Sequence, residues 1–406
     1  MLNNQQISTV KSTIPLLESV GPALTEHFYT RMFEHNPELK DIFNMSNQHT
    51  GRQQVALFQA IAAYAKNIEN LQVLTTAVER IAQKHTSFYI QSSHYEIVGH
   101  HLIETLRELA KDVFTNEIEQ AWTAAYAYLA GIFIARENEL YTERADAKGG
   151  WQGKREFVLV EKRIESAWVK TLVFEPADKG AVIGYTPGQY LGIDVKPSLS
   201  EYQEIRQYSL SGTPNGKRYQ ISVKREIQGH AGLVSNFLHD ELRLGDSVDL
   251  LAPCGDFFYQ NKDTPTVLIS AGVGLTPMQS MIEQLFATNV QQPLVYLHAC
   301  NNSDEHSFSE RVSEIISSDH GSKFSWEKHT WYAEETPAPK TESERQYFHH
   351  GFLDLKQVEN ELYINEADFY LCGPLVFMES AKQQLLTLGA TDDQIHYEVF
   401  GPHEDL

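Results

Sequence analysis

Residues 80–89 of the chain read RIAQKHTSFY, and His85 lies in the middle of this stretch. Ile81 and Phe88 recur at helical spacing around His85, so the stretch is expected to form a helix with His85 on its apolar face. A lone histidine among apolar neighbours is more often an ordinary core residue than a ligand. His85 becomes a candidate metal ligand only if the chain supplies partners for its other ring nitrogen.

Two residues further along the chain are candidates for these partners. A long helix is expected from residue 116, and its apolar stripe ends at Glu137. Tyr95 falls in the first turn of another expected helix, which a capping box of Ser93 and Glu96 would begin. A carboxylate and a hydroxyl behind an imidazole fix its tautomer and raise its basicity. Taken singly, Glu137 is also compatible with a solvated helix end and Tyr95 with an interface tyrosine.

The composition describes a multidomain globular chain. At 406 residues it exceeds the length at which single cores stop growing, about 250–300 residues, and we expect three domains. A net charge of −21 argues against nucleic-acid binding, which needs clustered Lys and Arg. No apolar run approaches about 18 residues and the N-terminus lacks a signal-peptide pattern, so we expect neither export nor a membrane span.

The cysteines exclude some classes of site. Cys254, Cys300 and Cys372 are far apart and form no C-x-x-C pair, which argues against a disulfide framework, a zinc ribbon or an iron–sulfur cluster. A reducing cytoplasm suits such a chain. We expect a cytoplasmic monomer.

Periodicity changes twice along the chain. Residues 1–138 show helical spacing almost throughout and are expected to be an all-α domain. Residues 150–262 contain many short alternating runs between Gly and Pro turns, which predicts an antiparallel β-barrel. Residues 263–406 alternate apolar strands with helices, which predicts an α/β domain with a doubly wound parallel sheet.

The second domain contains residues suited to a flavin dinucleotide. Arg206, Gln207, Tyr208 and Ser209 place a cation, an aromatic face and a hydroxyl on one short strand. Arginine can bind a pyrophosphate, and tyrosine can lie against an isoalloxazine ring. An ordinary surface strand is the plainer alternative. A helix start near Gly232, Val234 and Ser235 offers backbone N–H groups to phosphate, and Tyr190 opens a neighbouring strand.

The third domain begins with an apolar strand followed by a glycine loop. The loop has the pattern G-x-G-x-x-P and consists of Gly272, Val273, Gly274, Leu275, Thr276 and Pro277. Glycine pairs at strand-to-helix turns also occur for purely conformational reasons. A second loop, Cys372-Gly373-Pro374, follows a later strand.

Taken together, these residues and motifs resemble the bacterial flavohaemoglobins, in which a globin is joined to a reductase of the ferredoxin reductase superfamily. The resemblance covers the whole chain. It implies that His85 ligates the iron of haem b, with Tyr95 and Glu137 behind it. The implied pocket consists of Tyr29, Gln53 and Leu57 on the distal side and Phe43 against the porphyrin.

The same resemblance implies roles for the reductase residues. FAD would be bound by Tyr190, Arg206, Gln207, Tyr208, Ser209, Gly232, Val234 and Ser235. NADH or NADPH would be bound by the loops 272–277 and 372–374. The closing segment is Val399, Phe400, Gly401 and Pro402, with Phe400 over the flavin. Lys84 and Glu398 would lie between flavin and haem and tune electron transfer.

The implied activity is that of a nitric oxide dioxygenase, which uses NAD(P)H and O₂ to convert NO to nitrate. Two alternatives remain open: an NAD(P)H-dependent flavin or ferric reductase with a sensing globin, and an oxygen carrier or gas sensor. The chain departs from the family pattern at Ala231, where proline is usual, and lacks an arginine soon after His298 that would hold a 2′-phosphate.

Overall fold

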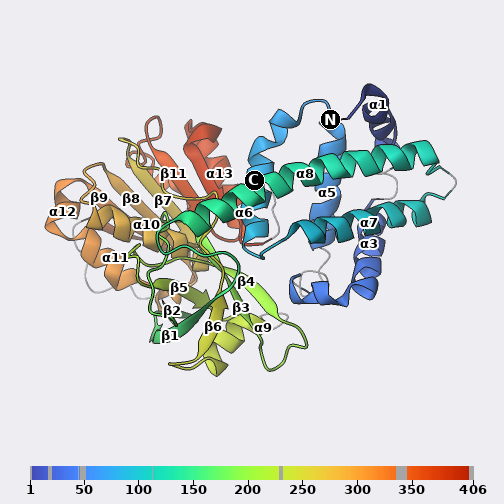
Figure 1. Ribbon diagram of the computed structural model, residues 1–406. Helices are drawn as coiled ribbons and strands as arrows, with labels where there is room; N and C mark the ends of the chain where they lie inside the picture. The colour runs from blue at the N-terminus through green and yellow to red at the C-terminus, as the bar shows by residue number, and fades with distance from the viewer. Residues whose placement is uncertain are drawn as a thin grey trace.

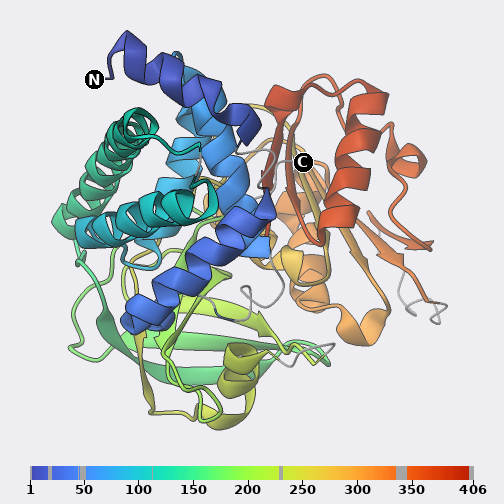
Figure 2. The same cartoon turned by 90° about the vertical axis from the view of Figure 1, so that its right-hand side faces the viewer.

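The computed structural model describes residues 2–16, 21–43, 45, 52–111, 113–227, 232–334 and 345–401. The chain forms a helical part, an antiparallel sheet and a parallel sheet with helices (Figure 1). Figure 2 shows them as three lobes that meet in the middle of the molecule. None of the helices among the described residues combines the length and the apolar character that a transmembrane span requires.

The first part is helical, as the periodicity predicts. Its elements are α1 (Asn4–Ser12), α3 (Pro22–His35), η1 (Pro37–Asp41), α5 (Arg52–Lys66), η2 (Leu71–Leu74), α6 (Thr75–Thr86), α7 (Ser92–Leu109) and α8 (Asn116–Asp146). Helix α8 runs to Asp146, so the helical part extends past residue 138, where the sequence led us to end it. No Gly or Pro interrupts residues 132–146, so nothing in the sequence stops the helix at Glu137.

The capping box expected at Ser93 and Glu96 is wrong. Helix α7 begins at Ser92, and the capping box is formed by Gln91 and His94. The side chain of Gln91 accepts a hydrogen bond from the backbone of residue 94, and the backbone N–H of Gln91 donates to His94 Nδ1 at 3.1 Å. Glutamine and histidine are uncommon in these two places, which explains why the motif of Ser and Glu misled the prediction.

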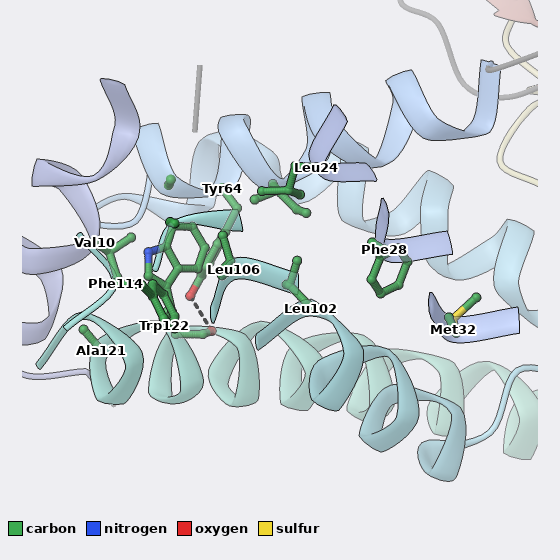
Figure 3. Close-up of a cluster of buried hydrophobic side chains, with 14 of the residues drawn as sticks. Val10, Leu24, Phe28, Met32, Tyr64, Leu102, Leu106, Phe114, Ala121 and Trp122 are labelled. Carbon is green, nitrogen blue, oxygen red and sulfur yellow. Dashed lines mark hydrogen bonds between the residues drawn. The ribbon is translucent and has the colours of Figure 1, made fainter. Parts of the chain in front are cut away.

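One apolar cluster holds the helices of this part together. Figure 3 shows Val10, Phe28, Leu102 and Trp122 among its members, contributed by α1, α3, α7 and α8. An unpaired buried donor costs about 1–3 kcal/mol, and the phenol of Tyr64 avoids this cost. The Tyr64 hydroxyl donates to the Ala125 carbonyl at 2.8 Å, the bond drawn in Figure 3.

The second part is a six-stranded sheet with the order β4-β3-β6-β1-β2-β5, in which every described pair is antiparallel. Its strands are β1 (Arg155–Ile164), β2 (Val169–Pro176), β3 (Tyr190–Val195), β4 (Glu204–Ser209), β5 (Tyr219–Lys224) and β6 (Ser247–Leu250). A bridge between Leu210 and Ile221 brings the chain after β4 onto β5. The two edges of the sheet thereby meet, as in the predicted barrel. Helix α9 (Leu233–Asn236) and the π-helix η3 (Phe237–Glu241) contribute Val234 and Leu238 to the apolar core of this sheet.

The third part is a parallel sheet of six strands in the order β10-β9-β8-β7-β11-β12. The strands are β7 (Thr266–Ala271), β8 (Leu294–Cys300), β9 (Trp326–Tyr332), β10 (Gln346–His350), β11 (Asp368–Cys372) and β12 (Ile395–Glu398). The helices are η4 (Gly272–Gly274), α10 (Leu275–Ala287), η5 (Ser303–Glu305), α11 (Ser309–Ile316), α12 (Asp319–Lys323), η6 (Leu355–Val358), α13 (Leu375–Leu388) and η7 (Asp392–Gln394).

Both faces of this sheet are buried. Leu268 of β7 packs in a cluster with α10 and α11, whereas Val267 and Ile269 pack in another cluster with α13. A parallel sheet with helices on both faces is the doubly wound arrangement that the apolar strands predicted.

Candidate functional site

His85 lies at the end of α6, and its ring nitrogen Nδ1 is held from behind. Nδ1 is 2.8 Å from Glu137 Oε1 and 2.9 Å from the Tyr95 hydroxyl oxygen. The Tyr95 hydroxyl in turn donates to Glu137 Oε1 at 2.5 Å. Glu137 is 2 % exposed, so the apolar stripe of α8 carries a buried carboxylate and not a solvated helix end. The structure thus brings together His85, Tyr95 and Glu137, which the family resemblance had grouped, and their roles stay predictions.

Burial and electrostatics fix the protons in this group. Burial and the neighbouring Glu137 carboxylate raise the pKa of Tyr95 far above its ordinary value, so the phenol stays a donor. Glu137 Oε1 accepts from Tyr95 and from the Nδ1–H of His85. With the proton on Nδ1, the lone pair of the imidazole is on Nε2.

The donor set around His85 fits a haem. No hydrogen bond to Nε2 occurs among the residues that the structure describes, and the His85 side chain is 34 % exposed although Tyr95 and Phe133 pack against its ring. An imidazole with a carboxylate behind it and apolar neighbours is the kind of ligand that haem iron takes.

The expected distal residues lie in the neighbouring apolar cluster. The Tyr29 ring is 6 % exposed and packs at 6.0 Å from the Phe43 ring, and Leu57 lies against the same cluster. Leu129 of α8 packs against both this cluster and the one that includes Phe133 and Tyr95. Gln53 is in α5, but its side chain lies outside the described part of the structure.

Strands β3 and β4 bring the expected flavin-binding residues together. Tyr190 pairs with Ser209, and Ile193 pairs with Arg206. Arg206 and Tyr208 point to one side of β4 because side chains alternate along a strand. The side-chain nitrogen of Gln207 is buried and has no hydrogen-bond partner within the described residues. A buried amide without a protein partner fits a site whose partner is a ligand.

The helix start after β5 is tightly packed. A Cβ on Gly232 would lie 2.5 Å from Ser235 Oγ, so a larger residue would disturb this turn. Ser235 Oγ donates to the Gly232 carbonyl at 3.2 Å, and the Val234 side chain is buried in the apolar core of the sheet. Ala231 lies outside the described residues.

The two expected nucleotide loops touch each other at the carboxyl ends of neighbouring strands. Strands β7 and β11 are parallel neighbours. A Cβ on Gly274 would lie 2.3 Å from the Cys372 carbonyl oxygen, and one on Gly373 would lie 2.8 Å from Phe377. Gly272 has a φ of +52°. These glycines allow both backbones to approach the edge where ligands of such sheets bind.

The last strand, β12, leads back towards the helical domain. Glu398 is 8 % exposed, and burial raises its pKa to about 7, although the nearby Lys84 opposes the shift. Lys84 Nζ lies 5.3 Å from the centre of the Tyr190 ring. Phe400 follows with 45 % of its surface exposed, and Pro402 lies outside the described residues.

Residues that our sequence reasoning missed connect these groups. Arg80 and Gln83 of α6 contact Asp256 and Gly255, which belong to the segment that connects β6 to β7. Arg80, Gln83, Lys84 and Ser87 recur at helical spacing, so the sequence does show that they share one polar face of α6. A polar helix face is ordinarily solvated, however, so the pattern did not identify a contact between domains.

Comparison with known proteins assigns the same three parts. The sequence matches the globin family over residues 26–133. It matches the oxidoreductase FAD-binding domain over residues 156–259 and the oxidoreductase NAD-binding domain over residues 268–383.

Relatives with the same arrangement are similar to the chain over its whole length. A flavohemoprotein of Vibrio cholerae serotype O1 is 55 % identical over 408 residues, which covers 100 % of both chains. A crystal structure of flavohemoglobin from Malassezia yamatoensis with bound FAD and haem has a TM-score of 0.83 and 26 % identity, covering 98 % of this chain and 100 % of that one.

A further solved structure matches the reductase part. It is the flavohem-like FAD/NAD-binding domain of nitric oxide dioxygenase from Vibrio cholerae O1 biovar El Tor, with 47 % identity and a TM-score of 0.55. The match covers 61 % of this chain and 99 % of that one. The chain is an oxidoreductase that belongs to the flavohaemoprotein family, with a globin followed by FAD- and NAD-binding domains.

Proposed function

We propose that the protein is a cytoplasmic nitric oxide dioxygenase that detoxifies NO. The overall reaction converts two NO and two O₂ to two nitrate ions at the expense of one NADH or NADPH. The observation that carries the proposal is the buried group behind His85, in which Glu137 Oε1 is 2.8 Å from Nδ1. A carboxylate in this place favours oxidation chemistry over reversible oxygen storage, because it increases the electron donation of the imidazole.

When bound, NAD(P)H would supply a hydride, FAD would allow its electrons to pass one at a time, and haem would supply the iron for O₂. His85 would hold the iron through Nε2, while Glu137 and Tyr95 keep the proton on Nδ1. Tyr29 would offer its phenolic hydrogen to the O₂, and Leu57 and Phe43, which pack in the same apolar cluster, would exclude water.

Residues of the two sheets would bind the other groups. In the FAD domain, Arg206 would bind the pyrophosphate, Tyr190 and Tyr208 would lie against the ring system, and Gln207 would use its unpaired amide. The other proposed contacts are Ser209, Gly232, Val234 and Ser235. In the NAD domain the loops 272–277 and 372–374 would bind the nucleotide, and Phe400 would cover the flavin until the nicotinamide arrives.

We assign the domains from these elements. The globin domain would end with α8 at Asp146, the FAD domain would comprise residues 150–262, and the NAD domain residues 263–406. Cys254, Cys300 and Cys372 are unpaired, which suits a reducing compartment.

The proposal is tested with an NO electrode on the full-length protein loaded with haem and FAD. Rapid NO consumption that requires both NAD(P)H and air is the expected result. Oxidation of NAD(P)H by artificial acceptors without NO consumption would instead favour a flavin or ferric reductase with a gas-binding globin.

A further inference from the structure

The helix that carries His85 also contacts both reductase domains through another of its faces. Arg80 Nε is 3.3 Å from Asp256 Oδ2, and the Arg80 guanidinium lies 5.2 Å from the centre of the Tyr397 ring in β12. One turn further on, Gln83 contacts Gly255. Any change in how α6 sits on these residues therefore moves the helix end at His85 relative to the FAD domain.

Gln83 is the buried centre of this contact. It is 8 % exposed, and all the polar atoms of its side chain are engaged. Oε1 accepts from the Gly255 backbone N–H at 3.1 Å and from the Arg144 guanidinium at 2.5 Å. Nε2 donates to Glu79 Oε1 at 2.8 Å. One side chain thus joins α6, α8 and the FAD domain.

The network extends to either side of Gln83. Arg144 also donates to Thr86 Oγ1 at 2.6 Å, next to His85 in the sequence. Glu79 accepts from Arg136 of α8 at 2.7 Å. Two arginines of α8 therefore fix α6 from one side, while the Gly255 amide fixes it from the other.

Residues 254–256, here named the junction turn, pack against Tyr190. Cys254 and Tyr190 exchange backbone hydrogen bonds of 3.0 and 2.8 Å. Gly255 has a φ of +114°, and a Cβ there would lie 2.8 Å from Cε1 of the Tyr190 ring. The position of the Tyr190 ring is thus set by the junction turn, and the junction turn is tied to Gln83.

We propose that Gln83 is a positioning residue for electron transfer, because it holds the end of α6 at a fixed place relative to Tyr190. The inference rests on the proposed function only in requiring that electrons pass from flavin to haem. In each transfer one electron leaves the reduced flavin and one ferric iron becomes ferrous, and NAD(P)H supplies two electrons as one hydride. Gln83 itself contacts neither His85 nor the expected flavin-binding residues in any hydrogen bond among the described residues.

The test compares Gln83→Leu with the parent in the full-length protein with haem and FAD. Leucine has nearly the same size but cannot accept from Gly255 or Arg144, so both donors lose a buried partner. Gln346→Leu is the matched control. Gln346 begins β10, is 9 % exposed and donates to Ser317 Oγ at 2.8 Å, far along the chain from the junction turn. The conservative variant combines Gln83→Glu with Glu79→Gln. The new carboxylate accepts from both donors, and the new amide at position 79 replaces the donor that Gln83 gives to Glu79.

Two steps are timed separately by anaerobic stopped-flow spectroscopy: flavin reduction by NADH, and haem reduction trapped by carbon monoxide. We expect Gln83→Leu to slow haem reduction by about 10- to 100-fold, the usual cost of small misplacements, with flavin reduction unchanged. Gln346→Leu should change neither rate, and the double variant Gln83→Glu with Glu79→Gln should keep most of the haem reduction rate. Neither measurement uses NO, so the proposed dioxygenase activity can fail while this inference stands.

Amide hydrogen exchange gives a readout that does not depend on turnover. In Gln83→Leu the Gly255 amide should exchange faster, with protection elsewhere in the FAD domain unchanged. If Gln83→Leu does not fold, Gln83→Asn, which shortens the side chain by one methylene, enters the same comparison. Unchanged haem reduction with faster Gly255 exchange would overturn the inference, as would equal slowing of flavin and haem reduction.

Discussion

Replacing Glu137 by glutamine tests the group behind His85 without removing the ligand. The carboxylate accepts two buried hydrogen bonds, from His85 at 2.8 Å and from Tyr95 at 2.5 Å. Hydrogen bonds to charged groups contribute about 1.5–3 kcal/mol and neutral ones about 0.5–1.5 kcal/mol, so each loses roughly 1–1.5 kcal/mol. Since about 1.4 kcal/mol is tenfold, losing one of these contributions corresponds to about tenfold and losing both to about 100-fold. NO turnover should therefore fall by about 10- to 100-fold while haem stays bound.

The assay is NO consumption under air with excess NADH, normalised to the haem content of each preparation. Glu139→Gln is the control, because Glu139 lies on the same helix with a side chain that is 64 % exposed and pairs with Arg136 at 2.9 Å. Its turnover should match the parent. Equal turnover of Glu137→Gln and Glu139→Gln, at full haem content, would refute a role for the carboxylate in tuning His85.

Three other changes have defined outcomes. A fragment from residue 150 onward should bind FAD and reduce artificial acceptors without consuming NO, measured with an electrode; NO consumption by the haem-free fragment would contradict the division of labour. Tyr29→Phe should speed O₂ release by roughly one to two orders of magnitude, because a hydrogen bond of about 1.5–3 kcal/mol to a partly charged ligand is lost. Carbon monoxide release, measured by stopped flow, should change much less. Equal effects on both gases would mean that Tyr29 only shapes the pocket and donates no hydrogen bond to O₂. Burial raises the pKa of Glu398 from 4.5 to about 7, so the parent loses folding free energy as Glu398 deprotonates. Relative to the parent, Glu398→Gln should therefore become more stable as the pH rises from 5 to 8. In urea unfolding, the difference in the free energy of unfolding between variant and parent should grow by up to about 3 kcal/mol. A difference that stays the same at every pH would contradict the prediction.

The fold was predictable from the chain because each domain has its own periodicity. Helical spacing put His85 and Glu137 on apolar helix faces, and the family resemblance implied that they meet, although 52 residues separate them. Alternating strands predicted the sheet that carries Arg206, and the apolar run before Gly272 predicted the parallel sheet. The roles of these residues remain predictions, since geometry shows proximity and not chemistry.

Local ends and contacts between domains were harder to predict. The start of α7 depends on Gln91 and His94, whose capping is specific to this turn. Gln83 and Arg80 lie on a polar helix face, and only the folded chain shows that this face meets Gly255 and Asp256 instead of water. Contacts of this kind depend on how domains dock, which short-range sequence patterns do not encode.

The measurement that tests the account most directly is the stoichiometry of the complete reaction. The full-length protein with haem and FAD is given limiting NADH, excess O₂ and NO, and the nitrate formed is counted against NADH consumed. The account predicts two nitrate per NADH, with two NO consumed. NADH oxidation that yields no nitrate, in a protein shown to hold both haem and FAD, would contradict the proposed dioxygenase.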